Sequence, residues 1–141
     1  MTTIAYRDGV MVADTGCWDG DTYVGEVVKA IRTSAGALVG VSGSAADAGR
    51  VFAWAEGGAD GPLEIKNGTE ALLVSPEGAI SFIETEGRPV PIKTEFAATG
   101  SGTTIAIGAM AAGASAERAV EIAAQRDAHT RGPFTVLRLA R

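Results

Sequence analysis

The sequence contains very little of the two side chains that most often form disulfides or bind zinc. It has one cysteine, Cys17, and one histidine, His129, among 141 residues. A single cysteine cannot form an internal disulfide, and one cysteine with one histidine cannot supply a zinc cluster. This cysteine content is typical of a reducing compartment, so we expect a cytoplasmic protein. We also expect that the protein uses no metal and no other cofactor.

The sequence also lacks an excess of positive charge and a long apolar run. A formal net charge of −5 and an isoelectric point near 4.8 argue against a nucleic-acid partner. Apolar stretches are interrupted by glycine or charge well before the ~18 residues that a membrane span needs, so no membrane association is expected. The N-terminus has no basic segment followed by an apolar run, which argues against a secretory signal. Phosphate-binding glycine motifs are missing too, which disfavours nucleotide binding.

Turn residues and hydrophobic periodicity predict grouped strands and grouped helices. Strands are expected at Thr3–Tyr6, Val10–Asp14, Val27–Thr33, Ala37–Ser42, Ala71–Ser75, Ala79–Ile83 and Phe134–Leu139, with a proline-broken extended edge strand at Arg88–Ala98. Helices are expected from Ser44, in a capping-box-like pair with Asp47, to Gly57, then at Thr103–Ala112 and after Ser115. Residues Thr15–Gly25 and Gly57–Gly68 are expected to be loops. This order indicates an α+β protein with antiparallel sheets in a single domain, residues 1–141.

The start of the chain places a threonine directly after the initiator methionine. Removal of Met1 would make Thr2 the N-terminal residue. A threonine hydroxyl is a poor nucleophile until a base takes its proton, and a free α-amine, with an ordinary pKa of about 7.7–8.0, is a base already attached to the same residue. Such a site needs no histidine, which suits a chain that has only one.

Four stretches of the sequence resemble the proteasome β-subunit and HslV-type family of N-terminal nucleophile (Ntn) hydrolases. They are Thr2–Ile4 with Gly9–Asp14; Gly25–Ile31; Gly40–Ala48; and Gly100–Gly102 followed by Ala106–Ala109, Gly113–Ser115 and Arg126–Thr130. They occur in the family's order and together cover nearly the whole chain. The resemblance implies a four-layer αββα sandwich, two antiparallel sheets between helices, here with abbreviated helices.

The resemblance also implies roles for individual residues. Thr2 matches the nucleophile, Asp14 and Lys29 match a buried acid–base pair, and Gly43 matches the glycine whose backbone N–H forms the oxyanion hole. A lysine near the threonine oxygen would stabilise negative charge and lower the pKa of the adjacent amine.

An outer polar network is implied by three further positions, Ser101, Asp127 and Thr130, which match residues that orient the terminal amine. Here the chain departs from the family, because Thr130 is followed by Arg131 where serine and glycine are usual. The hydroxyl is kept, while the added methyl group and arginine alter its surroundings.

The positions that match the family's primary specificity pocket are all apolar or small. They are Val27, Ile31, Val41, Ala45 and Gly49. Such a pocket favours an uncharged side chain before the scissile bond. The expected function is therefore an N-terminal threonine endopeptidase acting on peptides or unfolded proteins, in a homo-oligomeric ring and with a possible ATP-dependent unfoldase as partner. Two alternatives stay open, namely a small-amide amidase of the same fold and an inactive assembly protein.

Overall fold

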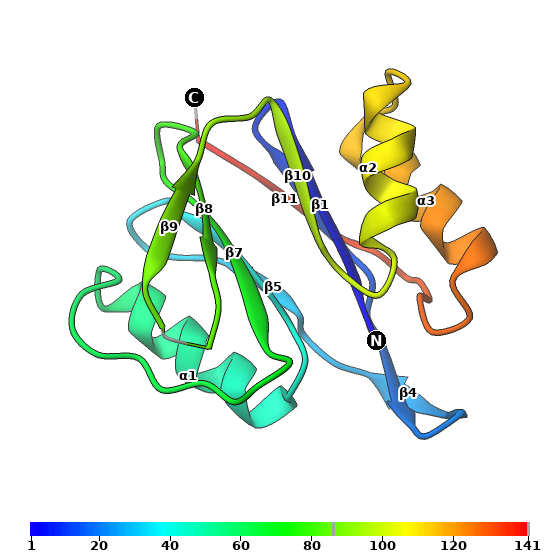
Figure 1. Cartoon of the computed structure of the whole chain (residues 1–141), viewed down its shortest axis with the longest axis horizontal. Coiled ribbons are helices and arrows are strands. Elements are labelled where there is room, and N and C mark those ends of the chain that lie inside the picture. Colours follow the sequence, from blue (N-terminus) through cyan, green and yellow to red (C-terminus); the bar gives the residue numbers. More distant parts are fainter. Residues whose placement is uncertain (86, 141) are drawn as a thin grey trace.

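The computed structural model describes residues 1–85 and 87–140 and contains three helices and three antiparallel sheets within those residues (Figure 1). The strands are β1 (Thr3–Arg7), β2 (Val10–Ala13), β3 (Gly16–Asp19), β4 (Thr22–Glu26), β5 (Ala30–Arg32), β6 (Leu38–Ser42), β7 (Glu70–Val74), β8 (Ile80–Ile83), β9 (Pro89–Ile92), β10 (Phe96–Gly100) and β11 (Thr135–Arg138). The helices are α1 (Ala45–Glu56), α2 (Thr103–Ala111) and α3 (Ala116–Arg126). The grouping of strands and helices predicted from the sequence is confirmed.

A four-stranded sheet, in the order β10-β1-β2-β11, carries the start of the chain in its centre. β1 and β2 form the expected hairpin, in which Arg7 pairs with Val10 across a two-residue turn. Asp8 and Gly9 both have positive φ, 52° and 79°, as the tight hairpin turn favoured by Asp-Gly requires. β10 covers the other edge of β1, with Thr3 opposite Gly100. The N-terminus is thereby held against the Gly100–Gly102 turn.

A five-stranded sheet, in the order β5-β6-β7-β8-β9, forms the second large unit. Its edge strand β9 carries two prolines, Pro89 and Pro91, which a central strand would not tolerate because proline has no N–H to donate. The sequence predicted one extended segment at Arg88–Ala98. That prediction was incomplete, because the segment divides into β9 and β10, which belong to different sheets.

Three apolar clusters explain how these elements pack. One unites both large sheets through Ile4, Tyr6, Met11, Ala13, Ala30, Leu38, Leu72, Val74, Ile80 and Ala97. Another joins the outer side of the five-stranded sheet to α1 through residues that include Val39, Val41, Val51 and Ile83. The last joins the outer side of the four-stranded sheet to α2 and α3 through residues that include Val12, Ala106, Met110 and Val120. Figure 1 shows α1 beside the sheet with β7 to β9, and α2 with α3 on the opposite side of the molecule.

Helix α1 begins and ends where the sequence predicts. Ser44 is its N-cap and accepts a hydrogen bond from Asp47 N, and Gly57 follows its last residue. Only one half of the predicted capping box forms, however. The Asp47 carboxylate accepts bonds from the side chain of Arg50, 2.6 Å away, and from Lys66 and Thr69, which lie in and after the following loop.

The expectation of a loop at residues 15–25 was wrong. β3 and β4 form a hairpin there, with Asp19 opposite Thr22. The Asp19-Gly20 pair is a turn signal, and the β-branched and aromatic residues after it favour a strand. The hairpin is held from outside by stacking, since the Arg131 guanidinium lies 3.8 Å from the centre of the Tyr23 ring. The neighbouring strand predicted at Val27–Thr33 is shorter, because ladder pairing begins only at Ala30.

Candidate active site

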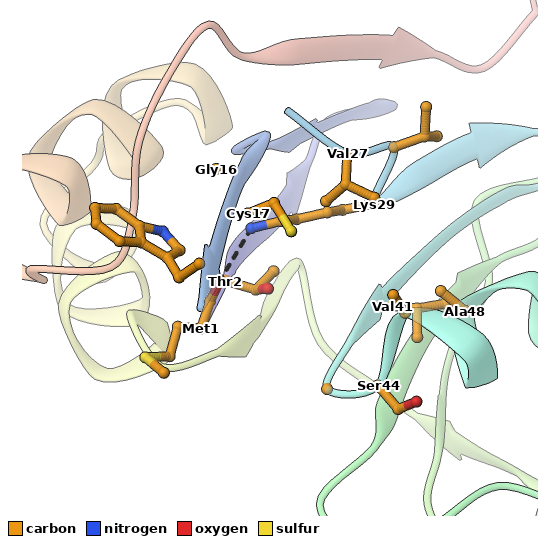
Figure 2. Close-up of a pocket in the computed structure, with 13 residues that line it drawn as sticks. Met1, Thr2, Gly16, Cys17, Val27, Lys29, Val41, Ser44 and Ala48 are labelled. Carbon is orange, nitrogen blue, oxygen red and sulfur yellow. Dashed lines mark hydrogen bonds between the residues drawn. The ribbon is translucent and has the colours of Figure 1, made fainter. Parts of the chain in front are cut away.

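A pocket of about 200 Å³ opens between the N-terminus, the β3–β4 hairpin and the start of α1 (Figure 2). It is lined by Met1, Thr2, Gly16, Cys17, Trp18, Val27, Val28, Lys29, Val41, Gly43, Ser44, Ala45 and Ala48. Three residues predicted from the sequence to be catalytic, Thr2, Lys29 and Gly43, therefore meet in one cavity. They come from both large sheets: Thr2 precedes β1 of the four-stranded sheet, whereas Lys29 precedes β5 and Gly43 follows β6 of the five-stranded sheet.

Asp14 and Lys29 form a buried ion pair beneath this pocket. Lys29 Nζ lies 3.0 Å from each carboxylate oxygen of Asp14. The Asp14 carboxylate also accepts the backbone N–H groups of Thr3, at 3.0 Å, and Arg131, at 3.1 Å. A buried charge is tolerated when it is paired and its remaining hydrogen-bonding capacity is used, and both conditions are met here.

The third donor position of the Lys29 ammonium group points to the first peptide bond of the chain. Lys29 Nζ donates to the carbonyl oxygen of Met1 at 3.0 Å, and Figure 2 shows its side chain extending to Met1 and Thr2. The Lys29 backbone is held in turn by Val41 N, which donates to Lys29 O at 2.8 Å. This bond places the lysine beside the end of β6, directly before Gly43.

On the other side of Thr2, the predicted outer network forms a continuous chain of hydrogen bonds. Thr2 N donates to Ser101 Oγ at 3.2 Å, and Ser101 Oγ lies 2.6 Å from a carboxylate oxygen of Asp127. Ser101 Oγ is also 3.2 Å from the carbonyl oxygen of Thr2, but its single proton can serve only one acceptor. The shorter contact to a charged oxygen takes it.

Thr130 completes this network. Thr130 Oγ1 donates to the same Asp127 oxygen at 2.5 Å, so its oxygen is left to accept from the hydroxyl of Thr3, 2.6 Å away. Burial alone would raise the pKa of Asp127, but the hydrogen bonds from Ser101 and Thr130 outweigh it and hold the pKa below its usual value. Asp127 is therefore an anion that orders the hydroxyl groups around it near neutral pH.

Gly43 lies between β6 and the N-cap of α1 and has φ of +115°. A Cβ at this position would stand 2.7 Å from the Cα of Thr69, a distance that real Cβ atoms do not show. Both the backbone angle and the lack of space require glycine here. The backbone of Gly43 and Ser44 thus lines the pocket at the N-terminus of α1. The partial positive charge at a helix N-terminus favours anions.

The predicted specificity residues are only partly brought together. Val27, Val41 and Ala45 line the pocket. Among the described residues that line it, Ile31 and Gly49 are not included: Ile31 packs against the cluster beneath α1, and Gly49 is exposed on α1. Trp18 and Val28, which were not predicted from the sequence as site residues, also line the pocket. The signal that could have located Trp18 there is the Asp19-Gly20 turn, which predicts the β3–β4 hairpin.

The described residues give no sign of a metal centre or a membrane span. No group of three or more His, Cys, Asp or Glu side chains is placed to hold a metal ion in them. None of the helices found in residues 1–85 and 87–140 has the length and apolar character to cross a bilayer.

Comparison with solved structures defines the class of fold. The chain matches a structure of Thiobacillus denitrificans BPH in complex with epoxomicin over 99% of each chain, with a TM-score of 0.68 and 21% identity. Another Thiobacillus denitrificans BPH structure matches over 99% of this chain and 98% of its own, with the same TM-score and 19% identity. Eukaryotic HslV from Trypanosoma brucei matches over 96% and 97%, with a TM-score of 0.66 and 20% identity. No protein-family model and no curated protein matches the sequence.

These matches, which cover 96–99% of the chain, establish its fold. The protein has the proteasome-β-like Ntn hydrolase fold, as the resemblance in its sequence predicted. At sequence identities near 20%, the structural similarity shows the fold alone. The chemistry depends on the residues that this chain places in the site.

Proposed function

We propose that the protein is an N-terminal threonine peptidase in which Thr2, freed of Met1, is the nucleophile. The observation that carries this proposal is the convergence of Thr2, Lys29 and Gly43 on one pocket. The hydrogen bond from Thr2 N to Ser101 Oγ supports the same assignment, because it holds the nitrogen that becomes the α-amine.

In the proposed reaction the Thr2 amine takes the proton of Thr2 Oγ1, directly or through a water molecule. Oγ1 then attacks the amide carbonyl, and Gly43 N–H donates to the oxyanion that forms. The protonated amine transfers its proton to the departing amine, which leaves an acyl ester on Thr2. Water, activated by the same amine, hydrolyses this ester.

Lys29 has an electrostatic role in this scheme. Its ammonium group, neutralised in part by Asp14, now donates to the Met1 carbonyl oxygen. With Met1 removed, that donor position turns to Thr2 and stabilises negative charge on Oγ1. The positive charge also favours the neutral, basic form of the nearby amine.

The substrate side of the pocket is apolar at Val27, Val41 and Ala45. This lining supports cleavage after uncharged residues, because burying an unpaired charge against these side chains would be costly. The fold shared with HslV supports two further proposals, a four-layer αββα order of the packed elements and a homo-oligomer that encloses the sites. Sedimentation velocity tests the second of these.

Intact mass spectrometry with epoxomicin tests the nucleophile. This epoxyketone forms its ring only with a hydroxyl and a free α-amine on one residue. One preparation should begin at Thr2, released from a cleavable N-terminal fusion, and the other should retain Met1. We expect one adduct on the chain that begins at Thr2 and none on the chain that retains Met1.

The matched control is Thr2→Ala, released in the same way, which keeps the amine and removes the hydroxyl. An adduct of equal yield on Thr2→Ala, or on the chain with Met1, would overturn the assignment of Thr2. Labelling of Thr2 with hydrolysis of small amides but not of peptides would keep the nucleophile and change the substrate class to that of an amidase.

A further inference from the structure

Asp47 is a completely buried carboxylate that has no part in the reaction proposed above. One of its oxygens accepts the backbone N–H of Lys66 at 2.8 Å and the hydroxyl of Thr69 at 2.9 Å. The other accepts the Arg50 guanidinium at 2.6 Å. The carboxylate therefore ties the first turn of α1 to a segment about twenty residues later in the chain.

The Thr69 hydroxyl links Asp47 to Ser44, the residue after Gly43. A carboxylate can only accept, so the single hydroxyl proton of Thr69 is directed to Asp47. The lone pairs of Thr69 Oγ1 then face the backbone N–H of Ser44, which donates to it at 3.2 Å. Thr69 is 1% exposed, so water does not compete for these bonds.

The same segment forms the wall behind Gly43. An ideal Cβ on Gly43 would lie 2.7 Å from Thr69 Cα and 2.8 Å from both Gly68 O and Thr69 Oγ1. The Gly43 backbone thus rests directly on Gly68 and Thr69, while the Ser44 N–H is bonded to the Thr69 hydroxyl. The Gly68–Thr69 segment therefore constrains both residues of the Gly43–Ser44 backbone, Gly43 by close packing and Ser44 by a hydrogen bond.

We propose that Asp47 and Thr69 are positioning residues that aim the Gly43 N–H into the pocket. This inference rests on the proposed function, in which Gly43 N–H receives the oxyanion. Asp47 orders Thr69, Thr69 holds Ser44 N–H and supports Gly43, and Gly43 keeps a fixed orientation before substrate arrives. Preorganised donors of this kind stabilise a transition state without reorganising during the reaction.

The charge of Asp47 suits this task. The hydrogen bond from Lys66 N–H, followed by those from Thr69 and Arg50, outweighs the opposing effect of burial and lowers the pKa of Asp47. Asp47 is thus a carboxylate throughout the pH range in which a terminal amine would act as a base.

Thr69→Val tests the proposal, because valine keeps the shape of threonine and removes the hydroxyl. Complete loss of an oxyanion donor costs roughly 10²–10³ in kcat, so misdirecting it should lower kcat at least about tenfold with little change in KM. Thr69→Ser, which keeps the hydroxyl, should restore most of the activity. Arg50→Gln is the matched control, because it removes only the outer bond to Asp47 and should leave kcat within about twofold.

A second measurement reads the same geometry without any catalysis. In ¹⁵N spectra the Gly43 amide resonance should shift in Thr69→Val and in Asp47→Asn, and remain in place in Thr69→Ser. A folded Thr69→Val with wild-type kcat, or with an unshifted Gly43 resonance, would overturn the inference. If the wild-type chain neither cleaves peptides nor binds epoxomicin, the proposed function fails, and the Gly43 resonance alone decides whether Asp47 and Thr69 hold this N–H.

Discussion

Lys29 Nζ and the Asp14 carboxylate are joined by two contacts of 3.0 Å, with 7% of the lysine side chain and none of the aspartate side chain exposed. Because both charged groups are removed from water, each one compensates the desolvation cost of the other. Removing one partner of a buried pair leaves the other charge without compensation, which costs about 3–5 kcal/mol. The pair that supports Thr2 in the proposed reaction is thus also part of what keeps the fold stable.

Lys29→Met should lower the free energy of unfolding by about 3–5 kcal/mol and abolish peptide hydrolysis. Methionine fills a similar volume, so the loss reports the missing charge rather than a cavity. Urea unfolding measures it. Adding Asp14→Asn to Lys29→Met should recover part of the stability, because the uncompensated charge is gone, while hydrolysis stays absent. A double variant less stable than Lys29→Met would contradict this account.

The lowered pKa of Asp127 predicts how the stability of the protein changes with pH. Burial opposes its ionisation, but the hydrogen bonds from Ser101 and Thr130 lower its pKa below that of an unfolded chain, about 3.9. Its contribution to stability is therefore complete above the unfolded pKa and disappears as pH falls through the folded pKa. The wild-type chain should exceed Asp127→Asn in melting temperature near neutral pH, and the difference should narrow below about pH 4. A difference that grows with acid would contradict the sign.

Thr130 allows a test of whether the hydroxyl or the methyl group of this side chain matters to the network. Its hydroxyl donates to Asp127 and accepts from the fully buried hydroxyl of Thr3. Thr130→Val leaves that Thr3 hydroxyl without this partner and should cost about 1–3 kcal/mol of stability in denaturant unfolding. Thr130→Ser keeps both bonds and should cost about 1 kcal/mol or less, the value of one buried methyl group. Equal losses in the two variants would show that the hydroxyl is not what matters.

Local signals in the sequence were sufficient for the elements whose ends are set by their own residues. The Asp8-Gly9 turn and the cap at Ser44 involve only neighbours in the chain, and both form as predicted. The β3–β4 hairpin was missed although its Asp19-Gly20 turn is equally local. Its residues are mostly exposed or half-buried, so the alternation between buried and exposed positions is weak.

The long-range part of the site was beyond such signals. Thr2 contacts Ser101 and Thr3 contacts Thr130, across most of the length of the chain. Periodicity says nothing about which distant turns meet, so these residues were identified through the resemblance to Ntn hydrolases. The role of Thr69 was missed for a related reason. Its bond to Asp47 joins α1 to the residue before β7, and nothing near Thr69 in the sequence predicts that partner.

Two glycine substitutions separate the requirement at Gly43 from the general effect of adding a methyl group. Gly43→Ala places a Cβ 2.7 Å from Thr69 Cα at φ of +115°, so it should cost about 1–3 kcal/mol from the backbone angle and more from the contact. It should also displace the proposed oxyanion donor and remove peptide hydrolysis.

Gly108→Ala is the matched control, because Gly108 lies exposed within α2 and a Cβ there meets nothing within 4 Å. Alanine should stabilise that helix by roughly 0.5–1 kcal/mol and leave hydrolysis unchanged. Thermal unfolding and peptide hydrolysis, measured on both variants, distinguish the two effects: a Gly43→Ala chain as stable and active as Gly108→Ala would mean that the Gly43–Thr69 contact imposes no constraint on the site.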